Sequence, residues 1–103
     1  MFWLARSELV DVSEGATRSV EIVNKRGLHA RASAKFVKCA STFDAEVRVA
    51  KDGHTVDARS IMGLMMLAAA PGCSIDIEAE GTQADEAVDA LVALVEGRFH
   101  EER

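Results

Sequence analysis

The chain has 103 residues, of which 49% are apolar, so we expect one domain whose core needs neither disulfides nor a structural metal. Its net charge of −5 argues against a general nucleic-acid binder. No apolar run reaches membrane-spanning length, and Arg6, Glu8 and Asp11 interrupt any signal-peptide core, so we expect a cytoplasmic protein that does not act at a membrane.

The first half of the chain predicts a strand and a helix after an irregular start. Residues 1–15 lack a hydrophobic period and are expected to form an N-terminal extension ahead of one domain, 16–103. Alternating apolar residues predict a strand over Thr17–Val23, and Asn24–Gly27 is expected to be a loop. Ala30–Ser41 follows as a helix. Its apolar stripe is expected to contain Ala30, Ala34, Val37 and Ala40, with Phe36 beside it.

The middle of the chain predicts a hairpin and a short helix. Strands over Ala45–Ala50 and Thr55–Ala58 flank Asp52-Gly53, a strong turn signal. Ser60 is a favoured N-cap residue, so we expect a short helix that begins there and ends before Pro71. Its core-facing residues are expected to be Leu64, Leu67 and Ala68.

The last part predicts a half-buried strand and an amphipathic helix. Apolar and polar residues alternate from Cys73 to Ala79, and Gly81 ends the strand. Thr82 is expected to cap the helix, with Asp85 as a short-armed capping-box partner. The apolar stripe of that helix is expected to consist of Ala84, Ala87, Val88, Leu91, Val92, Val95 and Phe99.

The order of elements is therefore β-α-β-β-α-β-α. Four strands each have one face to bury, and three helices are available to cover it. We expect an α+β fold, a two-layer open-faced sandwich in which three helices cover one face of a four-stranded antiparallel sheet. Many unrelated functions use this architecture, so the function has to come from particular residues.

One segment of this acidic chain is basic. Ile22 to Phe43 contains no acidic residue. The segment holds five basic residues: Lys25, Arg26, Arg31, Lys35 and Lys38. Such a cluster can be a solvated face, or it can attract an anionic group or the acidic surface of a partner.

His29 lies at the junction of the predicted loop and the first helix, and Arg31 follows in the first turn. The first N–H groups of a helix lack intrahelical partners and carry partial positive charge, so they suit a phosphoryl group. Arg31 adds a planar fork of donors for phosphate oxygens. Because imidazole titrates near neutral pH, a neutral nucleophilic form is available. His29 is therefore a candidate phosphoryl acceptor.

Two motifs of the chain resemble those of the HPr family, the histidine-containing phosphocarriers of the bacterial phosphotransferase system. Gly27-Leu28-His29-Ala30-Arg31, continuing to Val37, is similar to the family's phosphohistidine motif. Arg59-Ser60-Ile61-Met62-Gly63, continuing to Met65, is similar to its second motif. The resemblance extends over about residues 16 to 99, with both motifs in the family's order.

The resemblance implies a role for each matched residue. His29 would accept the phosphoryl group at Nδ1 from enzyme I and pass it to an enzyme IIA domain. Arg31 would steady the phosphoryl group. Ser60 would match the serine that a dedicated serine kinase/phosphorylase modifies in some bacteria. The chain would be a carrier and not an enzyme. The partner-binding surface is expected to contain Ala30, Lys38, Ile61, Met62 and Met65, because flexible methionines adapt to several partners.

Two alternatives remain beside the carrier. A regulatory docking module of the same fold would act through Ser60 phosphorylation without carrier turnover. A small-molecule enzyme is disfavoured, because no second general acid or base accompanies His29 in a motif. The sequence leaves open whether the pathway serves sugar uptake or nitrogen and carbon regulation.

One residue within the first motif differs from the family, and the cysteines and the other histidines lie outside both motifs. Family members commonly have proline where Ala32 stands, so a looser first turn with retained chemistry is expected. Cys39 and Cys73 are expected to be buried thiols. His54 and His100 lack the spacing of metal ligands, so we expect surface residues, no metal and no cofactor, in a protein that is a monomer.

Overall fold

The structure, a computed structural model, describes residues 15–101. The predicted extension therefore lies outside the described residues except for Gly15, which opens the first strand. The elements in chain order are β1 (Gly15–Glu21), α2 (Ala30–Ala40), β2 (Glu46–Lys51), β3 (His54–Asp57), α3 (Ile61–Met66), β4 (Ser74–Glu80), α4 (Ala84–Glu96) and the 3-10 turn η1 (Arg98–His100).

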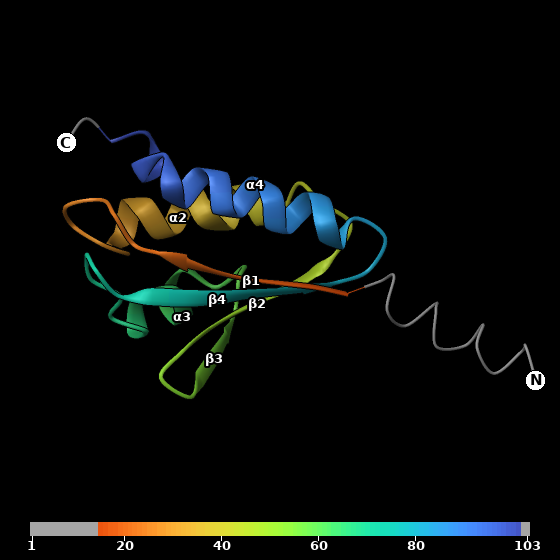
Figure 1. Ribbon diagram of the computed structural model, residues 1–103, viewed down its shortest axis with the longest axis horizontal. Helices are drawn as coiled ribbons and strands as arrows, with labels where there is room; N and C mark the ends of the chain where they lie inside the picture. The colour runs from red at the N-terminus through yellow and green to blue at the C-terminus, as the bar shows by residue number, and fades with distance from the viewer. Residues whose placement is uncertain (1–14, 102–103) are drawn as a thin grey trace, which may run out of the picture.

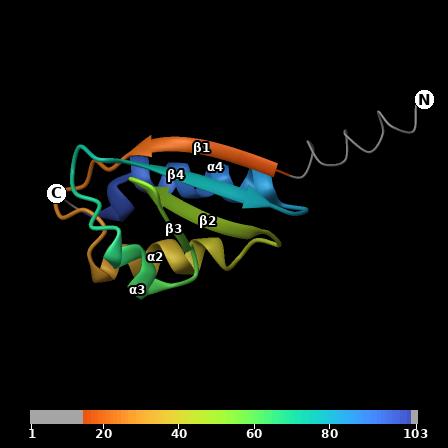
Figure 2. The ribbon, with the colours of Figure 1, turned by 90° about the horizontal axis from the view of Figure 1, so that it is seen from below.

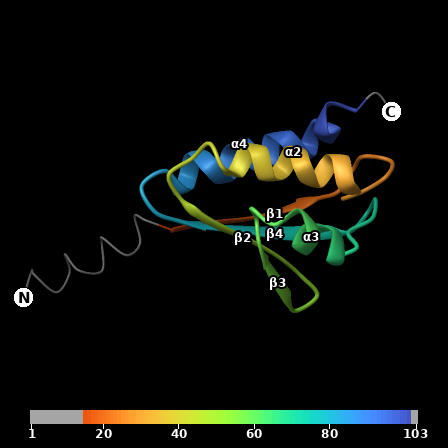
Figure 3. The same ribbon diagram turned by 180° about the vertical axis from the view of Figure 1, so that it is seen from behind.

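The four strands form one antiparallel sheet in the order β1-β4-β2-β3. Helices α2 and α4 lie side by side over one face of the sheet (Figures 1 and 3). The short helix α3 lies at the β3 end of the sheet, where it contacts both β3 and α2 (Figure 2). The predicted two-layer α+β sandwich with three helices is confirmed.

The core follows the predicted alternation of apolar residues. Ile75, Ile77 and Ala79 of β4 and Val47 and Val49 of β2 are buried, because side chains alternate between the two faces of a strand. The predicted stripe of the last helix is confirmed up to Val95. Its buried members on α4 are Ala84, Ala87, Val88, Leu91, Val92 and Val95. Phe99 is buried as well, but α4 ends at Glu96 and Phe99 lies in η1 with a φ of +56°, so it does not belong to the helical stripe.

The predicted stripe of α2 was wrong in part. Ala30 and Ala34 are exposed, whereas Ala32, Ser33, Phe36 and Ala40 are buried. Phe36 has by far the largest apolar surface on this helix, so its burial decides which face turns inward. Ser33 is tolerated on that face because its hydroxyl donates to the carbonyl oxygen of Leu28 at 3.3 Å.

Helix α3 is shorter than predicted. It ends at Met66, and Ala68 has a φ of +53°. Helical periodicity no longer applies there, so Ala68 is exposed and Ala69 is buried in its place. Leu64 and Leu67 are buried as predicted.

The predicted cap of α4 was also wrong. The N-cap residue is Gln83 and not Thr82, and its side chain does not bond the helix start. Gln83 Oε1 instead accepts from the N–H of Asp44 at 2.8 Å.

Both cysteines are half-buried rather than buried. Burial raises the pKa of the Cys39 thiol, which keeps it protonated and unreactive near neutral pH.

Candidate functional site

The loop before α2 is held by a close backbone approach at Gly27. This residue has a φ of +65°, and a Cβ atom there would lie 2.3 Å from the carbonyl oxygen of Ala69 and 3.1 Å from Cα of Ala70. The next residue, Leu28, donates its N–H to that same Ala69 oxygen at 3.0 Å. The loop after α3 therefore fixes the loop before α2, which sends Leu28 into the core and His29 to the start of the helix.

His29 is the N-cap residue of α2, as its predicted place at the loop–helix junction suggested. Its backbone is extended, with φ −77° and ψ −179°. The ring atom Nδ1 accepts from the N–H groups of Arg31 at 3.2 Å and Ala32 at 3.4 Å. The ring thus occupies the position at the helix start where an anion would meet unpaired N–H groups.

The other ring nitrogen of His29 has a partner that the sequence analysis missed. Nε2 lies 2.6 Å from Oε2 of Glu101. The second carboxylate oxygen, Oε1, accepts from Nδ2 of Asn24 at 3.2 Å. Asn24 Nδ2 also donates to the carbonyl oxygen of Gly27 at 2.9 Å. Both oxygens of the Glu101 carboxylate therefore have a partner, His29 for Oε2 and Asn24 for Oε1.

These contacts define where the ring proton of His29 lies. Nδ1 faces two N–H donors, so it presents its lone pair. An ionised carboxylate can only accept, so Nε2 carries the hydrogen that points at Glu101. The arrangement is that of a neutral imidazole protonated at Nε2, with its nucleophilic lone pair on Nδ1.

The ionised state of Glu101 agrees with its surroundings. Burial would raise the pKa of its carboxyl group, but hydrogen bonds from His29 and Asn24 and the nearby charge of Lys35 outweigh that effect and lower the pKa. Glu101 is thus a carboxylate near neutral pH.

The segment after α4 is anchored by two groups. Phe99 is fully buried, and Nζ of Lys35 donates to its carbonyl oxygen at 2.6 Å. Glu101 lies 72 positions after His29, so no motif spacing could reveal the pair. The sequence offered one signal for this pair, the predicted burial of Phe99. Burying Phe99 brings Glu101, two residues later, close to the start of α2.

Three of the predicted site residues lie exposed on α2: Ala30, Arg31 and Lys38. The basic segment as a whole faces outward, since Lys25 and Arg26 are exposed as well and only Lys35 is partly covered. Positive charge therefore surrounds the start of the helix that holds His29.

Ser60 is the N-cap residue of α3, as predicted, and its Oγ accepts from the N–H of Gly63 at 2.9 Å. The residues that follow it form an exposed apolar patch. The exposed fractions are 41% for Ile61, 69% for Met62, 39% for Met65 and 79% for Met66, a residue that the sequence analysis did not select. Helix α3, which holds this patch, contacts α2, the helix that begins after His29.

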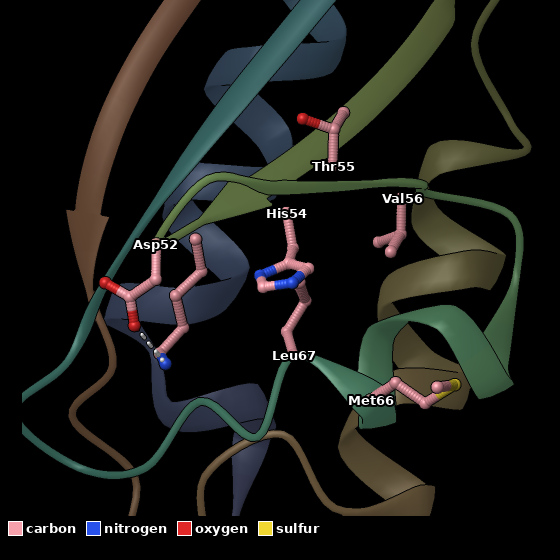
Figure 4. Close-up of a pocket in the computed structure, with 7 residues that line it drawn as sticks. Asp52, His54, Thr55, Val56, Met66 and Leu67 are labelled. Atoms are coloured by element: carbon pink, nitrogen blue, oxygen red, sulfur yellow. Dashed lines mark hydrogen bonds and ion pairs between the residues drawn. The ribbon is translucent and has the colours of Figure 1, made fainter.

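Three hollows lie elsewhere on the surface of residues 15–101, and none is lined by His29 or Arg31; the two larger ones are near the helices. One of about 570 Å³ lies between α2 and α4, with Lys35, Lys38, Cys39 and Leu94 in its lining. The other, of about 450 Å³, lies between the β2–β3 hairpin and the end of α3 (Figure 4). His54 and Thr55 line it from the hairpin, and Met66 and Leu67 line it from the α3 side.

Within residues 15–101, no group of three or more histidine, cysteine or acidic side chains is arranged to hold a metal ion. In the same range, no helix combines the length and apolar character needed to cross a bilayer.

The comparison with known families matches the description "PTS HPr component phosphorylation site" over residues 16–97. The chain belongs to the HPr family. The "Phosphocarrier protein HPr" of Cupriavidus necator is 50% identical over 84 residues, which cover 82% of this chain and 94% of that protein. The "Phosphocarrier protein NPr" of Shewanella violacea is 44% identical, with 82% of this chain and 92% of that protein covered. The crystal structure of HPr from Thermoanaerobacter tengcongensis superposes with a TM-score of 0.81 at 45% identity, covering 85% of this chain and 99% of that one.

Proposed function

We propose that the chain is a phosphocarrier that takes a phosphoryl group from phosphorylated enzyme I onto Nδ1 of His29 and passes it to an enzyme IIA-type acceptor. The observation that carries the proposal is the lone pair of Nδ1 at the start of α2, in reach of the N–H groups of Arg31 and Ala32. Membership of the HPr family supports the same reading.

The transfer needs little machinery beyond this geometry. The Nδ1 lone pair forms a bond to phosphorus, and the bond between phosphorus and the donor atom of phosphorylated enzyme I breaks, leaving its electron pair on that donor atom. The N–H groups at the helix start then face the phosphoryl oxygens, and the exposed Arg31 fork adds charge-assisted hydrogen bonds. Such transfer depends mainly on positioning and electrostatics.

Partners are proposed to dock on the apolar patch of α3 and the exposed part of α2. Ile61, Met62 and Met65 supply an adaptable apolar surface. On α2, the small side chain of Ala30 leaves the backbone accessible, and Lys38 adds positive charge. A basic, methionine-rich surface fits partners with acidic and apolar docking faces. We propose that the protein works as a cytoplasmic monomer.

Regulation at Ser60 is the second candidate function. Its side chain lies at the start of α3 next to the exposed Ile61 and Met62, so a serine kinase/phosphorylase would add charge at the docking surface itself. A phosphate there would be tolerated by the helix start and would repel an acidic partner. A module without carrier turnover would work through this change alone.

The test is incubation with phosphoenolpyruvate and a cognate bacterial enzyme I, followed by intact mass at neutral pH and after brief acid. His29→Ala serves as the control variant. We expect one acid-labile phosphoryl adduct that is absent in His29→Ala. An absent adduct, under conditions that modify a known carrier, would rule out the carrier and leave the docking module.

A further inference from the structure

The two nitrogens of the His29 ring have partners of opposite kinds. Nδ1 accepts from two neutral N–H groups at 3.2 and 3.4 Å, which are long hydrogen bonds. Nε2 lies 2.6 Å from the ionised carboxylate of Glu101, which is a short, charge-assisted contact. The strong partner therefore holds the nitrogen that does not react.

The carboxylate of Glu101 is itself oriented. Its other oxygen accepts from Asn24, whose side chain is 1% exposed and whose Nδ2 is also tied to the carbonyl oxygen of Gly27. Two groups hold the backbone before Glu101, namely the buried Phe99 ring and the Lys35 ammonium. The side chain is fixed from both ends, as positioning residues for histidine commonly are.

We propose that Glu101 is a positioning residue for phosphoryl transfer, which orients the ring, keeps its lone pair on Nδ1 and stabilises the charge that the ring gains on phosphorylation. This proposal rests on the proposed role of His29 as the acceptor.

The charge of the His29 ring changes with the bonds that form and break. When Nδ1 bonds to phosphorus, Nε2 keeps its proton, so the ring itself becomes cationic while the phosphoryl oxygens carry the negative charge. The Glu101 carboxylate at 2.6 Å from Nε2 is placed to stabilise that cation. No proton has to leave the site during the step, so the same contact serves both acceptance and onward transfer.

The experiment compares the full chain with Glu101→Gln, which keeps the size of the side chain and removes its charge. Glu96→Gln is the matched control, since Glu96 is the exposed last residue of α4. Two quantities are measured: the rate of phosphorylation by phosphorylated enzyme I, and the tautomer of the His29 ring from its ¹⁵N chemical shifts in the unphosphorylated protein. Urea unfolding of each variant verifies that it is folded.

We expect the wild-type ring to be protonated at Nε2 alone. In Glu101→Gln we expect a mixture of tautomers and a rate about tenfold lower, the worth of one charge-assisted hydrogen bond. Glu96→Gln should match the wild type. Glu101→Asp, which keeps the charge on a shorter arm, should recover part of the rate.

Equal rates and equal ¹⁵N shifts in the wild type and Glu101→Gln would overturn the proposal and leave Glu101 a structural anchor. A wild-type chain that takes no phosphoryl group would instead refute the carrier function. The ¹⁵N shifts do not depend on enzyme I, so they would still decide whether Glu101 sets the tautomer.

Discussion

Replacing Gly27 by alanine should destabilise the fold, because the new Cβ atom would clash with the backbone of Ala69. The φ of +65° costs an alanine about 1 kcal/mol. The added Cβ would lie 2.3 Å from the Ala69 carbonyl oxygen, so the two loops must separate. Separation breaks the 3.0 Å bond from the Leu28 N–H, and an unpaired buried N–H costs about 1–3 kcal/mol. The total loss is about 2–4 kcal/mol.

Gly53→Ala is the matched control for this prediction. Gly53 also has a positive φ, +83°, but no atom lies within 4 Å of the Cβ it would gain. It should therefore lose only the backbone contribution of about 1 kcal/mol. Equilibrium urea unfolding of both variants measures the difference in free energy of unfolding. If Gly27→Ala loses no more than Gly53→Ala, the close approach to Ala69 neither holds the loop before α2 nor sets the position of His29.

Three further variants or conditions test other parts of the structure. Ser60→Ala removes the acceptor of the 2.9 Å cap bond from Gly63 and should lower the free energy of unfolding by about 1 kcal/mol in urea, whereas Ser41→Ala, at an exposed position, should change it by less than about 0.5 kcal/mol. Because the pKa of Glu101 is lowered in the folded protein, the stability it contributes is present above its ordinary pKa of 4.5 and is lost as the pH falls below that value. The wild type should therefore lose its stability advantage over Glu101→Gln between about pH 5 and pH 3 in urea titrations, and a constant difference across that range would contradict the lowered pKa. Ala32→Pro removes the N–H that lies 3.4 Å from Nδ1 of His29. This N–H is in the first turn of α2 and makes no bond within the helix, so the free energy of unfolding should change by less than about 1 kcal/mol. A larger loss would show that this N–H matters to the fold.

Local signals in the sequence were enough for most of the fold. Ser60 caps α3 as predicted, because an N-cap needs only its own hydroxyl and an N–H three residues later. The Asp52-Gly53 turn joins β2 and β3, with positive φ at both residues, because the turn type demands that conformation. Both features depend on neighbours in the chain, which is why the sequence contains them.

The misplaced residues depend on distant partners. The packing of Phe36 against the core sets the buried face of α2. Ala30 and Ala34 have too little apolar surface to indicate from the sequence which face is buried. Gln83 replaced Thr82 at the start of α4, where its side chain bonds Asp44 from another part of the chain. Tertiary contacts decided both outcomes.

The candidate site divides in the same way. His29, Arg31 and the helix start lie within one local motif, so the sequence predicted their arrangement. Glu101 and Asn24 come from opposite ends of the domain and meet because Phe99 and Lys35 hold the segment after α4. The proposed acceptor nitrogen could thus be predicted from a motif, whereas the partner of the other nitrogen could be found only from the fold.

The difference between the two ends of the ring suits the proposed carrier role, in which His29 would meet more than one partner protein. An acceptor nitrogen has to be released from its resting contacts each time a phosphoryl group arrives, and the contacts of Nδ1 at 3.2 and 3.4 Å are weak enough for that. Nε2 keeps a 2.6 Å contact to a carboxylate anchored through Asn24 and the buried Phe99. The ring is therefore held at Nε2, which would keep its proton during the proposed transfer, and only weakly held at Nδ1, which would bond to phosphorus. This arrangement places the nucleophile reproducibly without a pocket that would keep partner proteins away.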